Sequence, residues 1–157
     1  MKAIERTVFR RWRRFGGVGG VTVEAFGQGR VANAATDKGP QRGAMEKDCT
    51  FCKIVNGETD TEFLYQDEEM VVFKDINPYA PVHLLVVPRR HIRSVNDLEP
   101  GDAGLMGRML LVARDAARAA AVAEDGYKLL FNVEWGAGQR VFHIHLHLLA
   151  GREWKHG

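Results

Sequence analysis

The sequence predicts an α+β domain in which an antiparallel sheet is backed by one main helix. Three observations predict this class. Short runs of β-branched and aromatic residues recur between turn residues, one long segment has apolar residues at helical spacing, and residues 142–148 alternate between apolar residues and histidine. The chain contains no internal repeat and no second set of elements. One domain is therefore expected.

The strands are expected in the following order. Residues 63–65 and 70–73 form a hairpin, and residues 83–88 form a third strand after a loop that two prolines, Pro78 and Pro81, hold in place. The last two strands, at residues 127–132 and 141–149, are expected to be neighbours in the sheet.

The main helix is expected from about Asp102 to Ala123. Its apolar residues recur at helical spacing, and its arginines lie off that face. Asp97 or Asp102 is expected to cap the helix, and Gly126 to close it.

Residues 1–44 differ in kind from residues 45–157. The first segment carries nine basic residues against three acidic ones, so the remainder of this chain of net charge +2 has a net charge of minus four. We interpret residues 1–44 as a basic, mostly disordered extension with a short helix at residues 3–14, and residues 45–157 as the folded domain. Three accounts of the extension stay open: a start placed upstream of a working Met45, an organellar presequence, or a basic tail that contacts an anionic surface.

Composition excludes several classes of function. An acidic domain does not favour binding to a nucleic-acid polymer, because phosphates are met by clustered lysine and arginine. No apolar stretch reaches the roughly 20 residues that a membrane-spanning helix needs. The only two cysteines, Cys49 and Cys52, form one Cys-x-x-Cys pair, and no secretory signal precedes them, which favours a cytoplasmic protein.

Three histidines stand at alternate positions, His143, His145 and His147. In a strand, this period of two places all three imidazoles on one face and the apolar residues on the other. Imidazole titrates near neutral pH and serves as base, nucleophile or metal ligand. The pattern therefore indicates chemistry on one face and core packing on the other.

The run His-Ile-His-Leu-His-Leu-Leu resembles the signature of the histidine triad (HIT) superfamily of nucleotide hydrolases and transferases. Matches to its Hint branch, the histidine triad nucleotide-binding proteins, extend in order over residues 48–152. They include Cys49–Ile54, Phe73–His83, Val87–His91, and Asn132 with Gly138 and Gln139. The resemblance implies a five-stranded antiparallel sheet with one main helix and a short N-terminal helix, pairing into a ten-stranded homodimer.

The resemblance also implies a purine nucleoside phosphoramidase that binds a nucleoside monophosphate or its phosphoramidate. His145 would be the nucleophile, which forms a covalent nucleotidyl-histidine. His143 and His147 would contact the phosphoryl oxygens, and His83 would orient the nucleophile or assist proton transfer.

Further residues are implied as nucleotide contacts, each with a plainer alternative. Asp75 would accept hydrogen bonds from the ribose hydroxyls, although it also suits a turn. The base would be held by apolar residues that are core residues by default, and the phosphate by residues before the histidines. The first set is Phe51, Ile54, Phe73 and Ile76, and the second is Asn132, Gly138, Gln139 and Val141.

Two features depart from the Hint pattern. Arg140 stands where animal members have a serine assigned to leaving-group protonation, and a guanidinium is a poor proton donor. The C-terminal residues 150–157 lack the usual Trp-Pro-Pro-Gly ending. Both departures put the leaving-group preference in doubt.

A structural zinc ion is expected as the only cofactor. One Cys-x-x-Cys pair supplies two of the four ligands that such a site needs. Zinc-carrying HIT proteins add histidines at the positions of His91 and His143, which gives Cys49, Cys52, His91 and His143. The alternatives are two buried free thiols or a redox dithiol.

Three functions compete for the same residues. The first is hydrolysis of nucleoside phosphoramidates through His145, and the second is a nucleotide-binding or zinc-binding interaction module with incidental turnover. The third is hydrolysis of dinucleoside polyphosphates, which the Hint-like loop at residues 78–81 disfavours.

Overall fold

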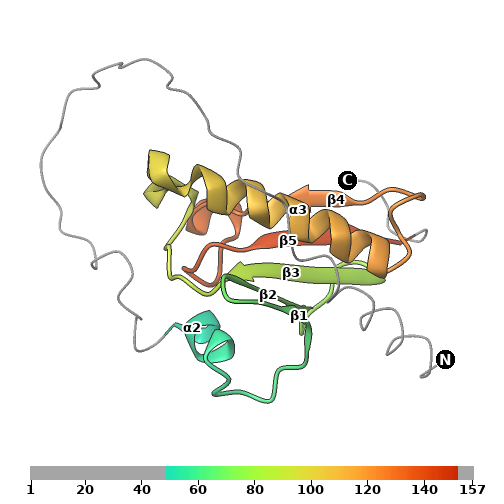
Figure 1. Cartoon of the computed structure of the whole chain (residues 1–157), viewed down its shortest axis with the longest axis horizontal. Helices are drawn as coiled ribbons and strands as arrows, with labels where there is room; N and C mark the ends of the chain where they lie inside the picture. The colour runs from blue at the N-terminus through green and yellow to red at the C-terminus, as the bar shows by residue number, and fades with distance from the viewer. Residues whose placement is uncertain (1–48, 152–157) are drawn as a thin grey trace, which may run out of the picture. The chain divides into compact units, whose positions relative to one another are not determined.

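The computed structural model describes residues 49–151, which form one five-stranded antiparallel sheet with a helix on each side of it (Figure 1). The expectations for residues 1–44, including the helix at residues 3–14, lie outside the described residues. The strands are β1 (Phe63–Gln66), β2 (Met70–Lys74), β3 (Val82–Pro88), β4 (Lys128–Leu130) and β5 (Leu146–Ala150).

The order of the strands across the sheet is β1-β2-β3-β5-β4, and every neighbouring pair is antiparallel. The predicted fold class and the predicted pairing of the last two strands are thus confirmed. In the β3–β5 register Leu85 lies opposite His147, and His83 lies opposite Leu149. Because side chains alternate across a strand, His83, Leu85 and His147 share one face of the sheet.

The main helix α3 (Ala103–Ala119) lies along the other face and packs against β3 and β5 (Figure 1). Its buried residues keep the predicted helical spacing; they are Met109, Val112, Ala113, Ala116 and Ala117. The helix ends earlier than predicted, because the backbone turns at Ala121, whose φ is 57°. Asp102 holds the N-cap position, but its carboxylate accepts from the Glu99 amide instead of capping the helix.

The short helix α2 (Thr50–Val55) packs at the face that carries the histidines. Phe51, Cys52, Ile54 and Val55 are its buried residues, and they form one apolar cluster with β2 and β3 residues. The β2 and β3 members of this cluster are Val71, Phe73, Leu85 and Val87. Three short 3-10 turns, η1 (Val95–Asp97), η2 (Pro100–Asp102) and η3 (Trp135–Ala137), lie in the connections.

The last two strands are shorter than predicted, and the prediction that His143 and His145 lie inside a strand is wrong. β5 begins at Leu146, so only His147 of the three histidines is a strand residue. The main-chain groups of this segment have other partners. The Ile144 amide donates to the Ile92 carbonyl at 2.6 Å, and the His143 carbonyl accepts from the His145 ring. These groups are therefore not available to a sheet ladder.

No helix in residues 49–151 is both long and apolar enough to cross a membrane.

Candidate functional site

His145 presents one ring nitrogen without a proton. Its Nδ1 lies 2.7 Å from the main-chain carbonyl of His143. Because a carbonyl only accepts, Nδ1 carries the proton and Nε2 keeps its lone pair. The ring is buried, with Phe51 edge-on at 5.0 Å between centroids and His147 at 4.8 Å. An imidazole in this state is suited to act as a nucleophile or base.

His147 belongs to a hydrogen-bonded chain that begins at the main chain of the proline loop. The Tyr79 amide donates to Nδ1 of His83 at 3.2 Å, so the proton of a neutral His83 lies on Nε2. That Nε2 lies 2.8 Å from Nδ1 of His147 and 3.4 Å from Oδ2 of Asp75. The proton of His147 is therefore fixed on Nε2. Nδ2 of Asn132, which is also a donor, lies 3.4 Å from this atom, so the two N–H groups stand side by side without a hydrogen bond between them.

All three histidines on this side of the cluster favour the neutral form. Burial lowers the pKa of His145, and burial also lowers the pKa of His83 although Asp75 opposes the shift. Burial, reinforced by repulsion from His145 and His83, lowers the pKa of His147 to about 4. At neutral pH the site thus holds an unprotonated ring nitrogen, Nε2 of His145, next to an N–H donor, Nε2 of His147.

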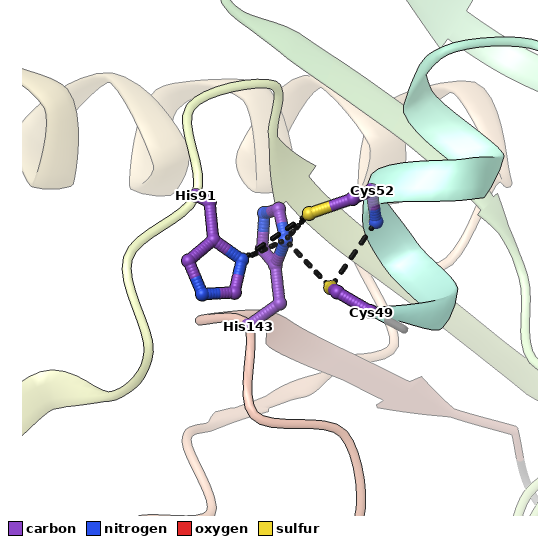
Figure 2. A group of neighbouring side chains, drawn as sticks. All are labelled: Cys49, Cys52, His91 and His143. Atoms are coloured by element: carbon purple, nitrogen blue, oxygen red, sulfur yellow. Dashed lines mark hydrogen bonds between the residues drawn. The ribbon is translucent and has the colours of Figure 1, made fainter. Parts of the chain in front are cut away.

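His143 faces a different set of neighbours (Figure 2). Its Nε2 donates to the Pro88 carbonyl at 2.8 Å, which leaves the lone pair on Nδ1. Nδ1 lies 3.5 Å from Sγ of Cys49, 3.5 Å from Sγ of Cys52 and 3.3 Å from Nδ1 of His91. In Figure 2 the two cysteines extend from α2 and meet His91, from the segment after β3, and His143, from the segment before β5.

These four side chains fit a tetrahedral metal site. Their ligand atoms all lie within 4.8 Å of one another, and all four residues are buried. A zinc ion with two sulfur and two nitrogen ligands holds neighbouring ligand atoms roughly 3.3–3.8 Å apart. The Pro88 carbonyl that orients His143 is a typical second partner of a metal-bound imidazole, and burial lowers the pKa of His143 to about 4. The Cys52 amide donates to Sγ of Cys49 at 3.2 Å.

Comparisons with known proteins agree with the fold. Residues 48–155 match the family model described as "Scavenger mRNA decapping enzyme C-term binding". A solved structure of a HIT family hydrolase from Legionella pneumophila is 44% identical, with a TM-score of 0.67 over 69% of this chain and 96% of its own. The chain belongs to the histidine triad family.

Other HIT proteins are comparably similar. The purine nucleoside phosphoramidase of Escherichia coli K12 is 42% identical over 108 residues, which cover 69% of this chain and 91% of that protein. Protein HitA of Neisseria gonorrhoeae is 45% identical over 101 residues, 64% of this chain and 94% of its own. A HIT family hydrolase from Clostridium thermocellum is 38% identical, with a TM-score of 0.69 over 72% of this chain and 98% of its own. The chain is thus a member of a family of hydrolases.

The residues expected to hold the nucleoside occupy two environments in this HIT domain. Phe51, Ile54 and Phe73 are buried in the cluster beneath α2, so packing alone accounts for their apolar character. Ile76 is 91% exposed. The neighbouring Asp75 uses Oδ1 to accept from the Asn77 amide at 2.8 Å, as in a turn, while Oδ2 points toward His83. Their contacts with a nucleoside stay predictions.

The residues expected to contact the phosphate lie on one loop, but their side chains make different contacts there. Nδ2 of Asn132 lies 3.4 Å from Nε2 of His147, and its contact with a phosphate stays a prediction. Gly138 has a φ of 88°, a conformation that glycine adopts without strain. The Gln139 side chain is buried and bonded to three main-chain groups, and Val141 packs against the apolar cluster. Gln139 and Val141 therefore stabilise the conformation of the loop.

Arg140 stacks on an exposed tryptophan. Its guanidinium carbon lies 4.2 Å from the ring centroid of Trp135, on the same loop. Within residues 49–151 every other arginine bonds to a carboxylate or a carbonyl, whereas Arg140 has this ring as its contact.

Sequence analysis did not identify Arg93 and Glu134, which join this loop to the segment after β3. Arg93 donates to both carboxylate oxygens of Glu134, at 2.6 and 2.8 Å. The two residues are 41 positions apart, and no local pattern marks either of them. The glycine-rich loop around Glu134 was the available signal, because such loops use backbone conformations that an ordinary residue rarely adopts.

Proposed function

We propose that this HIT protein is a nucleotide-binding hydrolase that cleaves the bond between the α-phosphorus and nitrogen of nucleoside phosphoramidates, such as adenosine 5′-phosphoramidate. The observation that carries the proposal is the hydrogen bond from Nδ1 of His145 to the His143 carbonyl, which leaves Nε2 as a nucleophile beside the His147 donor. Similarity to a protein called purine nucleoside phosphoramidase supports the substrate class.

The reaction would take two displacements at phosphorus. Nε2 of His145 attacks the α-phosphorus, a nitrogen–phosphorus bond to His145 forms, and the bond to the leaving nitrogen breaks as that nitrogen takes up a proton from solvent and departs as the amine. Water then attacks the same phosphorus and breaks its bond to His145, and the proton that this water loses returns to solvent, which gives the nucleoside monophosphate and the free imidazole. Each displacement is easier than a single direct attack by water, because the imidazole is the better nucleophile and a good leaving group.

The neighbours of His145 would stabilise the charge that develops on the phosphoryl oxygens. The Nε2 proton of His147, fixed by His83, is a donor that is aligned before the substrate binds. The Asn132 amide lies beside that proton and would contact the same oxygens. The Tyr79 amide holds His83 through Nδ1, and Oδ2 of Asp75 lies 3.4 Å from the same Nε2 that donates to His147, so the donor would need no reorganisation during the reaction.

The nucleoside would bind beside the proline loop. Oδ1 of Asp75 accepts from Asn77, so Oδ2, which also lies 3.4 Å from Nε2 of His83, would accept from the ribose hydroxyls. Ile76 is exposed and can close over a purine, with burial of its side chain as the driving force. Phe51, Ile54 and Phe73 would form the floor of this slot from the core side. Gly138, Gln139 and Val141 would hold the loop against the phosphate.

We also propose that Cys49, Cys52, His91 and His143 bind a structural zinc ion. The converging ligand atoms and the single available lone pair on Nδ1 of His143 support this site. Two thiolates and two imidazoles leave no open coordination position, so the ion would stabilise the fold and take no part in the displacement. His143 would then be a metal ligand and not a phosphate donor.

A homodimer in the cytoplasm is the proposed state of the protein. The outer side of α3 exposes Leu110 and Leu111, at 48% and 53%, and a partner that covered them would remove apolar surface from water. Both cysteines are free thiols, as a thiolate site in a reducing compartment requires. Light scattering on a sizing column tests the dimer, and a monomeric mass would refute it.

The proposed activity is tested with adenosine 5′-phosphoramidate and the substitution His145→Ala. We expect the wild type to release AMP and the variant to lose at least about a thousandfold in rate, since the nucleophile is gone. Equal release by both proteins, or by neither, would refute the activity. AMP binding without turnover by the wild type would favour an interaction module, and faster cleavage of a diadenosine polyphosphate would favour the third function.

A further inference from the structure

Glu134 has a backbone conformation that is unusual for a residue with a side chain. Its φ is 66° and its ψ is 167°, a region that is essentially restricted to glycine because a Cβ atom crowds the main chain there. In residues 49–151 only Ala121 shares a positive φ among the non-glycine residues. Such a conformation persists only where surrounding contacts hold it. Glu134 lies in the loop that carries Asn132, directly before η3.

The side chain of Glu134 supplies these contacts. Arg93 donates through Nη1 to Oε1 at 2.6 Å and through Nη2 to Oε2 at 2.8 Å, a two-point ion pair. The Ser94 hydroxyl lies 2.9 Å from Oε1. Hydrogen bonds from Arg93 and Ser94 lower the pKa of Glu134 to about 2, so the carboxylate stays charged at any working pH. The Arg93 guanidinium also lies 4.5 Å over the Phe142 ring.

Gln139 joins the same two segments a second time. Its Oε1 accepts from the Glu134 amide at 2.9 Å, and its Nε2 donates to the Arg93 carbonyl at 2.7 Å and to the Val141 carbonyl at 3.2 Å. The side chain is only 1% exposed. The loop of residues 132–141 is thus fastened at Glu134 and Gln139 to Arg93 and Ser94. We call this set of contacts the Arg93–Glu134 clasp.

The clasp joins the segment that follows His91 to the loop that carries Asn132. Arg93 is two residues after His91, a proposed zinc ligand, and Glu134 is two residues after Asn132, whose amide lies 3.4 Å from Nε2 of His147. A shift of the loop would move Asn132 relative to the histidines, and displacements of about 1 Å can cost on the order of a hundredfold in rate.

We propose that Glu134 is a positioning residue: the Arg93–Glu134 clasp holds the loop of residues 132–141 in the conformation that places Asn132 beside His147. The effect on turnover rests on the proposed phosphoryl transfer at His145. Glu134 touches no reacting atom and acts through the loop. Its unfavourable backbone conformation is held by the contacts of its carboxylate with Arg93 and Ser94.

Substitutions at Glu134 separate this role from a purely structural one. Glu134→Gly removes the clasp, and glycine adopts the observed backbone conformation without strain. Glu134→Ala also removes the clasp but keeps a Cβ atom, which crowds the main chain in this conformation. A structural residue would show loss of activity in step with loss of stability. A positioning residue would lose activity in both variants, although the glycine variant is the more stable of the two.

The matched control is Arg108→Gln. Arg108 is also an arginine paired with carboxylates, those of Asp67 and Glu69 in the turn between β1 and β2. Its loss removes an ion pair of the same kind without touching the loop or either histidine cluster. We expect thermal unfolding of this variant to change slightly and its kcat/KM for adenosine 5′-phosphoramidate to stay within about twofold of the wild type.

The deciding experiment measures thermal unfolding, zinc content, kcat and KM, and amide hydrogen exchange in residues 132–141 for the four proteins. We expect Glu134→Gly to unfold at a higher temperature than Glu134→Ala, to keep its zinc, and to lose about tenfold in kcat/KM, mainly in kcat. Exchange in the loop should be faster in both variants and unchanged in Arg108→Gln. Wild-type kcat/KM in Glu134→Gly, or a loss explained by missing zinc, would overturn the proposal.

The test of the clasp can be distinguished from the test of the proposed activity. If the wild type itself released no AMP, the phosphoramidase proposal would fail, and the exchange data alone would decide the clasp. Faster exchange confined to residues 132–141 in Glu134→Gly would support it, and unchanged exchange there would refute it.

Discussion

The two histidine clusters differ in where their lone pairs point. In the first cluster, Nδ1 of His143 converges on three other ligand atoms, those of Cys49, Cys52 and His91. In the second, Nε2 of His145 keeps a free lone pair. His143 and His145 are two residues apart and both are buried, so neither sequence spacing nor burial separates them. The difference comes from main-chain carbonyls, of Pro88 and of His143, which select the ring nitrogen that carries the proton.

This difference assigns one chemistry to each cluster. Four converging ligand atoms without an open position are typical of a structural metal site. A neutral imidazole beside an aligned N–H donor is typical of nucleophilic displacement at phosphorus. The account therefore predicts that the two clusters can be disabled separately.

The largest expected effect is on the metal cluster, through Cys52→Ser. We expect zinc content to fall from about one equivalent per chain to less than about a tenth, because a hydroxyl is a poor replacement for a thiolate ligand. Thermal unfolding should occur at a clearly lower temperature, since a bound structural ion contributes directly to folding. Elemental analysis of protein purified without added zinc is the measurement. A wild type with less than a tenth of an equivalent would contradict the site.

A smaller effect is expected from His147→Gln in the second cluster. The amide of glutamine keeps a donor but breaks the fixed contact with His83, so kcat should fall by about a hundredfold. Zinc content should equal that of the wild type, because His147 lies outside the group of Cys49, Cys52, His91 and His143; with Asp75 and His83 it forms a separate group of possible ligands. Steady-state kinetics and elemental analysis on one preparation test both statements. Loss of zinc in this variant would mean that the clusters are not independent.

The smallest effect is expected from pH. The proposed nucleophile acts as the neutral imidazole, and burial holds the pKa of His145 below 6.5. The value of kcat/KM should therefore be level above pH 6.5 and fall about tenfold per pH unit only below the lowered pKa. A fall that begins above pH 6.5 would contradict a buried neutral nucleophile.

Acid should also destabilise the fold in the same range. The pKa of His147 is about 4 in the folded state against 6.5 for an ordinary histidine, so the unfolded chain binds a proton first as pH falls. The contribution of His147 to stability is complete above pH 6.5 and is lost between pH 6.5 and about 4. Urea unfolding across this range measures it, and His147→Gln should remove that part of the pH dependence.

The sequence predicted the sheet, the main helix and the four metal-cluster residues because each has a periodic or motif signal. β3 and α3 follow from apolar spacing, and the Cys-x-x-Cys pair follows from ligand spacing, whereas His91 and His143 were implied by the resemblance to zinc-carrying HIT proteins. The end of the regular pattern was harder to predict. The alternation at residues 142–148 is that of a strand, but the Ile144 amide bonds to Ile92 instead of to a neighbouring strand.

Spacing alone does not separate the histidines; the resemblance to HIT proteins implied His145 as the nucleophile and left His143 as either a phosphate contact or a zinc ligand. The ring nitrogen that carries the proton in each histidine was not predictable. It depends on the Pro88 carbonyl, 55 residues from His143, and on a bond between His143 and His145 that periodicity does not reveal. The Arg93–Glu134 clasp was missed for the same reason, because its partners are brought together only by the fold. Contacts between irregular segments that are far apart in the sequence produce no periodic pattern of residues.

The most direct test of the account is to locate the covalent nucleotide. A reaction with adenosine 5′-phosphoramidate is quenched rapidly with denaturant at neutral or alkaline pH, where a phosphorus–histidine bond survives, and the protein is digested and mapped by mass spectrometry. The account predicts an adenylyl group on His145 and on no other residue. An adenylyl group on His143, or turnover without any adduct under conditions where the first step is fast, would contradict it.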